Sequence, residues 1–231
     1  MPKPRKAGLV DPYAAIKAAQ LAVKSRGEVA PVSGTQSGAD ELQRLGAQVR
    51  QGAVPTKQVI ECYECGYKFQ LHGRAATTNC SKCRVVLDLT DHTIDRKRTG
   101  TTKTVGTIRI AADAVVQSGE LIGNDIILEG TVEAGTVRAM RRLELRPGAR
   151  FSEQNVHALD LLIAPGATIA FLEPAKFRDV EIVGLLHANL HATGHVVIRA
   201  GGSFNGTLQS PRLIVEDGAG LGAVVRIGHC V

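Results

Sequence analysis

The sequence predicts an all-β protein: a three-sided parallel β-helix of about seven rungs, preceded by a small ribbon with four cysteines and a flexible N-terminal tail. Three observations support this fold class. Seven short segments share one pattern of polar and apolar residues and recur every 16 to 19 residues. Aromatic residues make up only 3% of the chain and tryptophan is absent, which disfavours a core built on large rings. Two Cys-x-x-Cys pairs precede the repeats, in a stretch too short to bury a core of its own.

Each repeat begins with a short segment in which every second residue is apolar, the alternation expected of a strand with one buried face. A corner residue follows a few positions later, usually a glycine, which accepts a positive φ without steric cost. One more large apolar residue, such as Val116 or Phe204, lies beyond the corner. Three short strands separated by corners describe one coil of a β-helix. The seven segments are residues 107–110, 125–128, 142–145, 160–163, 179–182, 195–198 and 212–215.

An enzyme of the left-handed β-helix class is the main alternative for the repeats. Six-residue spacings, as from Ile110 to Val116, are typical of acyltransferases with that fold, and spacing alone does not reveal handedness. The spacing slips between Leu128 and Val132, however, and we find no residues suited to bind coenzyme A. The sequence also lacks a nucleophile elbow, a phosphate-binding loop and a dinucleotide fingerprint. We therefore expect a protein that is not an enzyme.

The N-terminal tail (residues 1–58) accounts for much of the basic character of the chain. It holds nine Lys or Arg against four Asp or Glu, whereas residues 101–231 hold twelve against thirteen. We expect a largely disordered tail with two marginal helices, since short helices are barely stable alone. A partner-binding helix and a membrane-surface anchor are the alternatives. The tail lacks the apolar stretch of a signal peptide and no apolar run is long enough to cross a bilayer, so we expect a cytoplasmic protein, with membrane association left open.

Residues 59–90 contain the sharpest chemical signal. Cys62 and Cys65 form one Cys-x-x-Cys pair, Cys80 and Cys83 form another, and 14 residues separate the pairs. Four thiolates at this spacing suit tetrahedral Zn²⁺, and a site closed by four cysteines is structural because no coordination position stays open for a substrate. Disulfides are rare in cytosolic proteins, and a rubredoxin-like iron site is the other alternative. The sequence therefore predicts a zinc ribbon that folds around its metal.

Two interpretations of the ribbon's surface remain open. Aromatic residues (Tyr63, Tyr67, Phe69) are interleaved with positive charge (Arg74, Lys82, Arg84), as in many nucleic-acid-binding modules. The simpler interpretation is that the aromatic rings pack the small hairpin and the cations face solvent. An unidentified protein is then the expected partner of the ribbon, and nucleic acid is the alternative.

Residues 91–104 are expected to form a polar, basic linker between the ribbon and the repeats. The segment contains the cluster Arg96, Lys97 and Arg98, which is a candidate for contacting nucleic acid or an anionic membrane surface. The simpler alternative is that these three side chains are merely solvated.

The repeats, taken as residues 105–231, have no polar capping unit that we recognise at either end, although solenoids need one to stay soluble. The unpaired strand edges of the first and last rungs are therefore expected to stack on other copies of the chain and to form a filament. The residues expected at this polymer interface are Ile108 and Ile110 in the first rung and Leu213, Val215, Leu221, Val224 and Val225 at the other end.

The repeat region over residues 105–225 resembles the bactofilins, a polymer-forming family of bacterial cytoskeletal proteins. The resemblance rests on units such as residues 161–169 and 196–204, in which an apolar strand runs into a glycine corner. It implies a right-handed, three-sided β-helix that polymerises through its ends without a nucleotide and serves as a cytoskeletal scaffold in bacteria, often at the membrane. The zinc ribbon departs from the simplest family pattern. It suggests an added interaction module.

Overall fold

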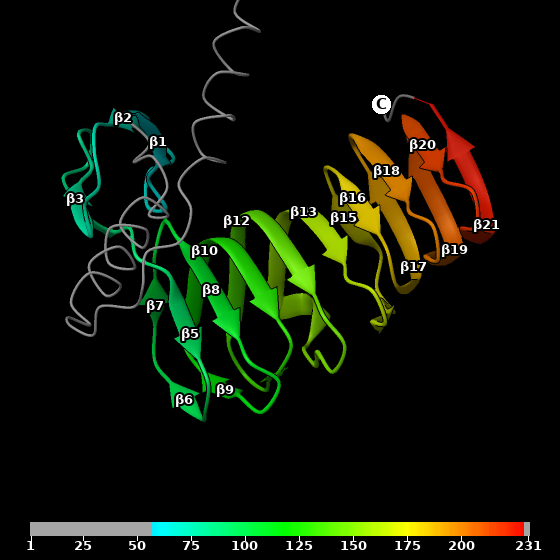
Figure 1. Cartoon of the computed structure of the whole chain (residues 1–231), viewed down its shortest axis with the longest axis horizontal. Helices are drawn as coiled ribbons and strands as arrows, with labels where there is room; N and C mark the ends of the chain where they lie inside the picture. The colour runs from blue at the N-terminus through cyan, green and yellow to red at the C-terminus, as the bar shows by residue number, and fades with distance from the viewer. Residues whose placement is uncertain (1–56, 229–231) are drawn as a thin grey trace, which may run out of the picture. The chain divides into compact units, whose positions relative to one another are not determined.

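The computed structural model describes residues 57–228, so the two helices expected in the N-terminal tail lie outside the described residues. Residues 57–228 belong to one compact unit. In it, four short strands precede a long stack of parallel strands (Figure 1). Within residues 57–228 the only helix is a short 3-10 turn, η1 (Glu153–Asn155), and no helix of this region is long and apolar enough to cross a bilayer. The all-β prediction is confirmed.

The ribbon (residues 58–90) consists of two antiparallel hairpins. Its strands are β1 (Gln58–Glu61), β2 (Lys68–Leu71), β3 (Thr77–Asn79) and β4 (Val86–Asp88), with β1 paired to β2 and β3 to β4. Tyr63 joins the two hairpins, because its nearly buried ring places the hydroxyl 3.0 Å from the Val86 carbonyl oxygen, to which it donates. Strands of three or four residues cannot form a core alone, which makes the ribbon dependent on a crosslink.

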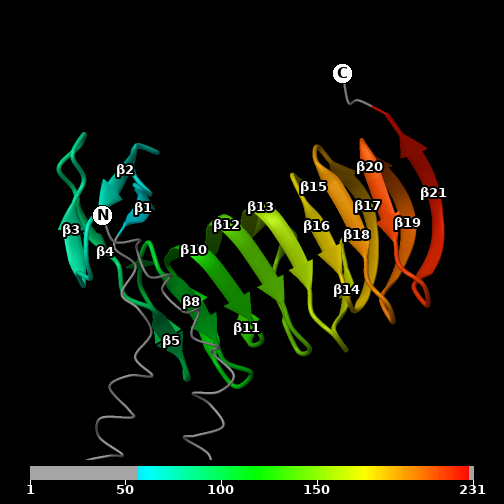
Figure 2. The same cartoon turned by 45° about the horizontal axis from the view of Figure 1, so that its top comes forward.

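The predicted repeat segments stack in register on one face of a parallel solenoid. The strands of this face are β5 (His92–Ile94), β8 (Thr107–Ile110), β10 (Glu120–Leu128), β12 (Thr136–Leu145), β13 (Val156–Ile163), β16 (Val180–Ile182), β18 (His195–Ile198) and β20 (Arg212–Val215). They lie side by side in Figure 2. Pairing aligns the first apolar residue of every segment in one column: Ile108, Ile126, Leu143, Leu161, Val180, Val196 and Leu213. The parallel β-helix and its register are confirmed, with eight coils in place of the expected seven.

Two further faces complete each coil. Their strands are β6 (Arg98–Thr99), β7 (Thr102–Lys103), β9 (Val115–Ser118), β11 (Thr131–Val132), β14 (Thr168–Ala170), β15 (Ala175–Phe177), β17 (Leu185–Ala192), β19 (Ser203–Ser210) and β21 (Gly220–Ile227). Long strands such as β17 and β19 pair along nearly their whole length and turn a corner on the way, so that one strand contributes to two faces. Inward positions such as Val196 and Phe204 are fully buried, because each is covered by its counterpart in the coils above and below.

Residues 91–104 form the first coil of the solenoid, so the prediction of a linker is wrong. In this segment β5 pairs with β8, β6 with β9, and β7 with the first half of β10. This coil lacks the apolar pattern of the other coils, because Arg98 and Thr102 occupy the positions at which the next coil has Val116 and Leu121. Hydrogen bonds of the backbone, which the side-chain pattern does not report, define this coil.

The sequence pattern predicted glycine at the corners because glycine accepts a positive φ. At two of the corners the reason is instead lack of space for a side chain. A Cβ on Gly130 would lie 2.3 Å from the Ala111 carbonyl oxygen, and one on Gly184 would lie 2.5 Å from that of Ala164. The backbone of one coil therefore touches the corner of the next. Gly148 and Gly201, by contrast, do have the expected positive φ.

The stack is interrupted on two of its three faces between the fourth and fifth coils. Within the described residues, β14 and β15 pair with β17 alone, and the first half of β13 pairs with β12 alone. The ladder between the second halves of β12 and β13 continues, so the two halves of the solenoid are joined by one sheet at this level. We call this interruption, between residues 151–158 and 168–177, the seam.

Candidate metal centre and solenoid surfaces

The four cysteines predicted as metal ligands lie together in two matching turns. In the first turn the Gly66 N–H donates to the Cys62 carbonyl oxygen at 2.8 Å, and in the second the Arg84 N–H donates to that of Cys80 at 2.9 Å. Gly66 and Arg84 both have left-handed backbones, with φ of +66° and +62°. This conformation folds each Cys-x-x-Cys segment back so that both of its sulfurs face the other turn.

The sulfur atoms have the separations of a tetrahedral thiolate site. Cys62 Sγ lies 3.7 Å from Cys83 Sγ, Cys65 Sγ lies 3.7 Å from Cys80 Sγ, and all four fall within 4.8 Å of one another. A tetrahedron with metal–sulfur bonds of about 2.3 Å has edges of about 3.8 Å. The cysteines are unpaired by disulfides. Their arrangement therefore fits a metal ion bound by four sulfurs.

The electrostatics of the four-cysteine cluster also favour binding of a cation. Backbone N–H groups, that of Cys83 first, lower the pKa of Cys80 to about 6 against the effect of burial. The Val85 N–H lowers the pKa of Cys83, but burial and the neighbouring sulfurs of Cys80, Cys65 and Cys62 raise it to about 12. The Cys80 thiol thus ionises easily, whereas the Cys83 thiol resists ionisation because adjacent thiolates repel each other. A bound divalent cation would remove that repulsion and let all four ionise.

The ribbon packs against the side of the first coils, and its core continues into the solenoid. Ile60 and Leu87 of the ribbon belong to one buried cluster with Val105 and Ile122, against which Met140 also packs. Ile122 is 2% exposed although the adjacent Leu121 faces the solenoid interior. Neighbouring residues of a strand point to opposite faces, so Ile122 is an outward residue that the ribbon covers.

Polar contacts reinforce this docking. The Asp88 carbonyl oxygen accepts from the Val105 N–H at 2.7 Å, and the Thr90 carbonyl oxygen accepts from the Thr104 hydroxyl at 2.6 Å. Lys103 Nζ lies 2.9 Å from Glu64 Oε1 of the ribbon. These bonds replace those that a preceding coil would provide, so the segment after β4 serves as the edge on which the first coil is built.

The residues predicted for the polymer interface at the N-terminal end are not at an end. Ile108 and Ile110 are both fully buried, because β5 of the first coil pairs directly over them. This part of the prediction is wrong because residues 91–104, which were expected to be a linker, form a coil that covers these two residues. The first coil offers His92, Ile94, Arg98 and Thr102 at the positions over the second coil, and three of these four are polar.

The C-terminal end differs, because the apolar residues predicted for its interface are exposed or half-buried. Val215 and Leu221 are 42% and 41% exposed, and Leu213 and Val225 are half-buried. All four continue inward-facing columns of the core. Val224 is the exception, since it pairs with the exposed Thr207 and so belongs to an outward column. We call residues 212–227 the terminal coil.

The basic cluster Arg96, Lys97 and Arg98 lies at a corner of the first coil. Arg96 and Lys97 are exposed in the turn between β5 and β6, where Arg96 Nε lies 3.4 Å from Asp95 Oδ1. Arg98 is half-buried in β6 and stacks over Val116. The three cations therefore differ in exposure, since two are exposed and one is half-buried.

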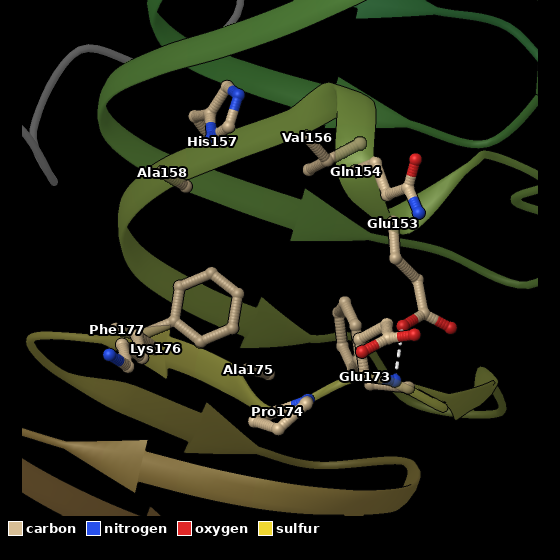
Figure 3. Close-up of a pocket in the computed structure, with 11 residues that line it drawn as sticks. Glu153, Gln154, Val156, His157, Ala158, Glu173, Pro174, Ala175, Lys176 and Phe177 are labelled. Atoms are coloured by element: carbon tan, nitrogen blue, oxygen red, sulfur yellow. Dashed lines mark hydrogen bonds between the residues drawn. The ribbon is translucent and has the colours of Figure 1, made fainter.

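The seam opens into a cavity of about 320 Å³, drawn in Figure 3. Its walls are the first half of β13 and strand β15, and the Phe177 ring lies between them. Phe171 and Phe177 make an edge-to-face contact with ring centroids 5.9 Å apart. Glu153 bridges the gap, because its carboxylate accepts from the N–H groups of Leu172 and Glu173, both at 2.8 Å. Large rings and this bridge replace the missing ladders.

Two features that matter for the ribbon and the seam were not recognised in the sequence, although each has a signal. Leu121 and Ile122 are adjacent apolar residues in β10, a pattern typical of a strand with both faces covered. At the seam, the longest repeat interval coincides with Pro174, which lacks the N–H that a ladder needs.

Comparison with known proteins returned no match among family models, curated proteins or solved structures.

Proposed function

We propose that this chain is a scaffold protein that self-assembles end to end through its β-solenoid, without a nucleotide, as the resemblance to bactofilins implies. The principal support is the terminal coil. Its inward-facing Val215 and Leu221 are about two-fifths exposed, whereas Ile198 and Phe204, on which they stack, are fully buried. Covering such apolar surface is worth about 25 cal/mol per Å², and strands β20 and β21 also present unpaired backbone groups.

A second copy of the same coil fits this end, because β20 is complementary to itself. Antiparallel pairing of two β20 strands centred on Ile214 would place Leu213 opposite Val215 and Arg212 opposite Glu216. Opposite charges across a strand pair are favourable, and apolar residues would meet in between. The first coil offers a poorer partner, since it presents polar groups. Two terminal coils facing each other would give a symmetric contact.

Charge placed on the terminal coil tests this proposal. Leu221→Arg is expected to lower self-association at least tenfold (about 1.4 kcal/mol), because it buries an unpaired cation in the contact, while the circular dichroism spectrum is unchanged. Leu172→Arg is the matched control, since Leu172 is 90% exposed in the middle of the solenoid. Mass photometry and negative-stain microscopy over a range of concentrations measure the effect. A wild-type chain that stays monomeric throughout would contradict the proposal.

We infer that the ion held by the four cysteines is a structural zinc. The donor set is all sulfur and leaves no open position, which is typical of structural zinc sites. The ribbon's strands of three and four residues need such a crosslink. Elemental analysis of the purified chain is expected to find one zinc per chain, and one iron per chain would contradict the assignment. The exposed apolar side chains Val59, Tyr67 and Val86 support a role of the ribbon as an interaction module.

A nucleic-acid-binding adaptor is the second candidate function. Arg74, Lys82 and Arg84 are exposed on the ribbon and, within residues 57–228, make no ion pair. Fluorescence anisotropy with single-stranded DNA and RNA tests this candidate, which requires binding that weakens steeply as salt is raised. Absence of binding at low salt would remove it.

A further inference from the structure

The two ends of the solenoid are chemically unlike each other. At the C-terminal end the inward positions hold Leu213, Val215, Leu221 and Val225. At the N-terminal end the first coil (residues 91–104) holds mostly polar residues at the equivalent positions, as described above. Polar residues at the end of a stack prevent further coils from adding, so the first coil is a cap of the kind that solenoids require.

The cap is held by the ribbon as well as by the second coil. Its strands β5, β6 and β7 contain three, two and two residues, so few ladder bonds fix them. Further contacts run to the ribbon side. Thr104 and Val105 donate to the carbonyl oxygens of Thr90 and Asp88, Lys103 pairs with Glu64, and His92 Nε2 lies 2.7 Å from Asp88 Oδ2. Loss of the folded ribbon would remove these partners.

Loss of the ribbon would also uncover apolar surface next to the cap. Val105 is 6% and Ile122 is 2% exposed, and both are covered in a cluster with ribbon residues. The ribbon itself depends on the metal at its four cysteines, because its hairpins are too small to fold without a crosslink. Metal binding, ribbon docking and order in the first coil are therefore thermodynamically linked, and whatever favours one favours the others.

We propose that metal occupancy of the cysteine site decides whether the N-terminal end of the solenoid is closed. With metal bound, the docked ribbon holds the first coil in place as a polar cap. After metal loss the first coil detaches and the second coil becomes the end of the stack. Its inward residues Ile108, Ile110, Val116 and Leu121 are at most 1% exposed beneath the cap, and they would form an apolar end like the terminal coil.

This switch changes how far assembly proceeds. A metal-loaded chain has one associating end, the terminal coil, and forms pairs. A metal-free chain has two associating ends and forms longer polymers. The inference rests on both the metal site and the self-association proposed above, so its experiment measures metal content, order in the first coil and particle size separately.

The experiment uses the full chain before and after metal removal with a chelator and a thiol-directed mercurial that is then washed out. Metal content is measured by elemental analysis, and hydrogen exchange is followed by mass spectrometry. Exchange in residues 92–105 is expected to rise about tenfold or more on metal loss, while residues 180–198 stay unchanged. Negative-stain microscopy is expected to show pairs with metal and extended particles without it. Unchanged exchange in residues 92–105 after measured metal loss would overturn the proposal.

A variant separates docking from metal binding. Ile122→Glu is expected to keep the metal but release the ribbon, so that residues 92–105 exchange rapidly and extended particles form with metal bound. Ile127→Glu is the matched control on the same strand, because Ile127 is half-exposed on another face. Wild-type exchange and pairs in Ile122→Glu would refute the switch. A chain that binds no metal at all would instead refute the metal site, and a metal-loaded chain that never pairs would refute the self-association.

Discussion

Gly66 and Arg84 occupy the same position in the two cysteine turns, but only one of them suits it. A left-handed backbone costs a non-glycine residue about 1 kcal/mol or more, and Arg84 bears this cost at φ +62°. The Arg84 N–H nevertheless closes its turn as well as that of Gly66 does. The second turn is thus strained in a way that the first is not.

Substitutions at these two positions are therefore expected to affect metal affinity differently. Gly66→Ala should weaken apparent metal affinity about fivefold, corresponding to about 1 kcal/mol of added strain. Arg84→Gly should leave the affinity unchanged or raise it slightly, since relief of strain offsets the greater freedom of glycine in the unfolded chain. Competition with a chromogenic chelator measures both variants. Equal losses in the two would show that the backbone conformation is not what matters.

Asp179 ties two coils together at a corner of the solenoid. Burial raises the pKa of its carboxyl, but the His195 N–H, the His195 ring and the Arg178 guanidinium outweigh burial and lower the pKa below its usual range. Arg178 also contacts Asp160, so the carboxylates share one cation. A carboxyl with a lowered pKa stabilises the fold above its ordinary pKa of about 4. That contribution disappears as the pH falls.

The free energy of unfolding should therefore decline between about pH 5 and pH 2, with Asp179 contributing on the order of 1 kcal/mol. Asp179→Asn should be less stable than wild type at pH 7, and the difference should shrink as the pH is lowered. Asp217→Asn, at an exposed corner, is the control. Urea unfolding at several pH values provides the measurement. A difference that persists at pH 2 would show that the charge of Asp179 is not responsible.

At the scale of elements, the seam is where strand pairing fails and side chains replace it. Phe151, Phe171 and Phe177 contact one another in sequence, with centroid separations of 5.8 and 5.9 Å. Rings of this size hold the fourth and fifth coils apart on two faces. The Glu153 carboxylate, bound to two backbone N–H groups, adds a polar link across the gap.

Removal of that link should loosen the seam without unfolding the stack. Glu153→Ala is expected to lower local stability by about 2 kcal/mol, since hydrogen bonds to a charged group contribute about 1.5–3 kcal/mol. Hydrogen exchange at residues 171–177 should accelerate accordingly. Gln154→Ala is the matched control, because Gln154 lines the same cavity but makes no side-chain hydrogen bond within the described residues. Similar exchange in both variants would show that the bridge is not needed.

At the scale of the whole described unit, the charges of the terminal coil decide which surface it can meet. Arg212 makes no ion pair within residues 57–228, whereas Glu216 binds Arg199 with Nη1 2.5 Å from Oε1. In the antiparallel contact proposed above, each Arg212 would face a Glu216 of the other copy. The contact is then specified by charge as well as by apolar surface.

Reversal of that charge tests the specificity. Arg212→Glu should weaken self-association about tenfold, because like charges would then face each other. Lys176→Glu changes the net charge equally at an exposed position far along the solenoid and should have no effect. Analytical ultracentrifugation at two salt concentrations measures both. Equal weakening in the two variants would indicate a general effect of net charge and not a specific contact.

The sequence was sufficient for the parts of this protein that depend on local spacing. Cys-x-x-Cys turns bring sulfurs together through a few residues of backbone, so Cys62, Cys65, Cys80 and Cys83 were predicted correctly as a cluster. Alternation of apolar residues reports which side of a strand is buried, so the column from Ile108 to Leu213 was predicted in register.

Tertiary structure alone decided where the stack begins, how the ribbon sits and where the ladders break. The first coil pairs with the second through backbone hydrogen bonds, which do not depend on a particular side-chain pattern, so its polar residues resembled a linker. Ile122 is buried because another element covers its outward face, and that meeting depends on chain segments far apart in the sequence. The apolar residues of the terminal coil could be recognised in the sequence and in the structure. Only the structure showed that Ile108 is buried, so that the first coil covers the other end of the apolar stack.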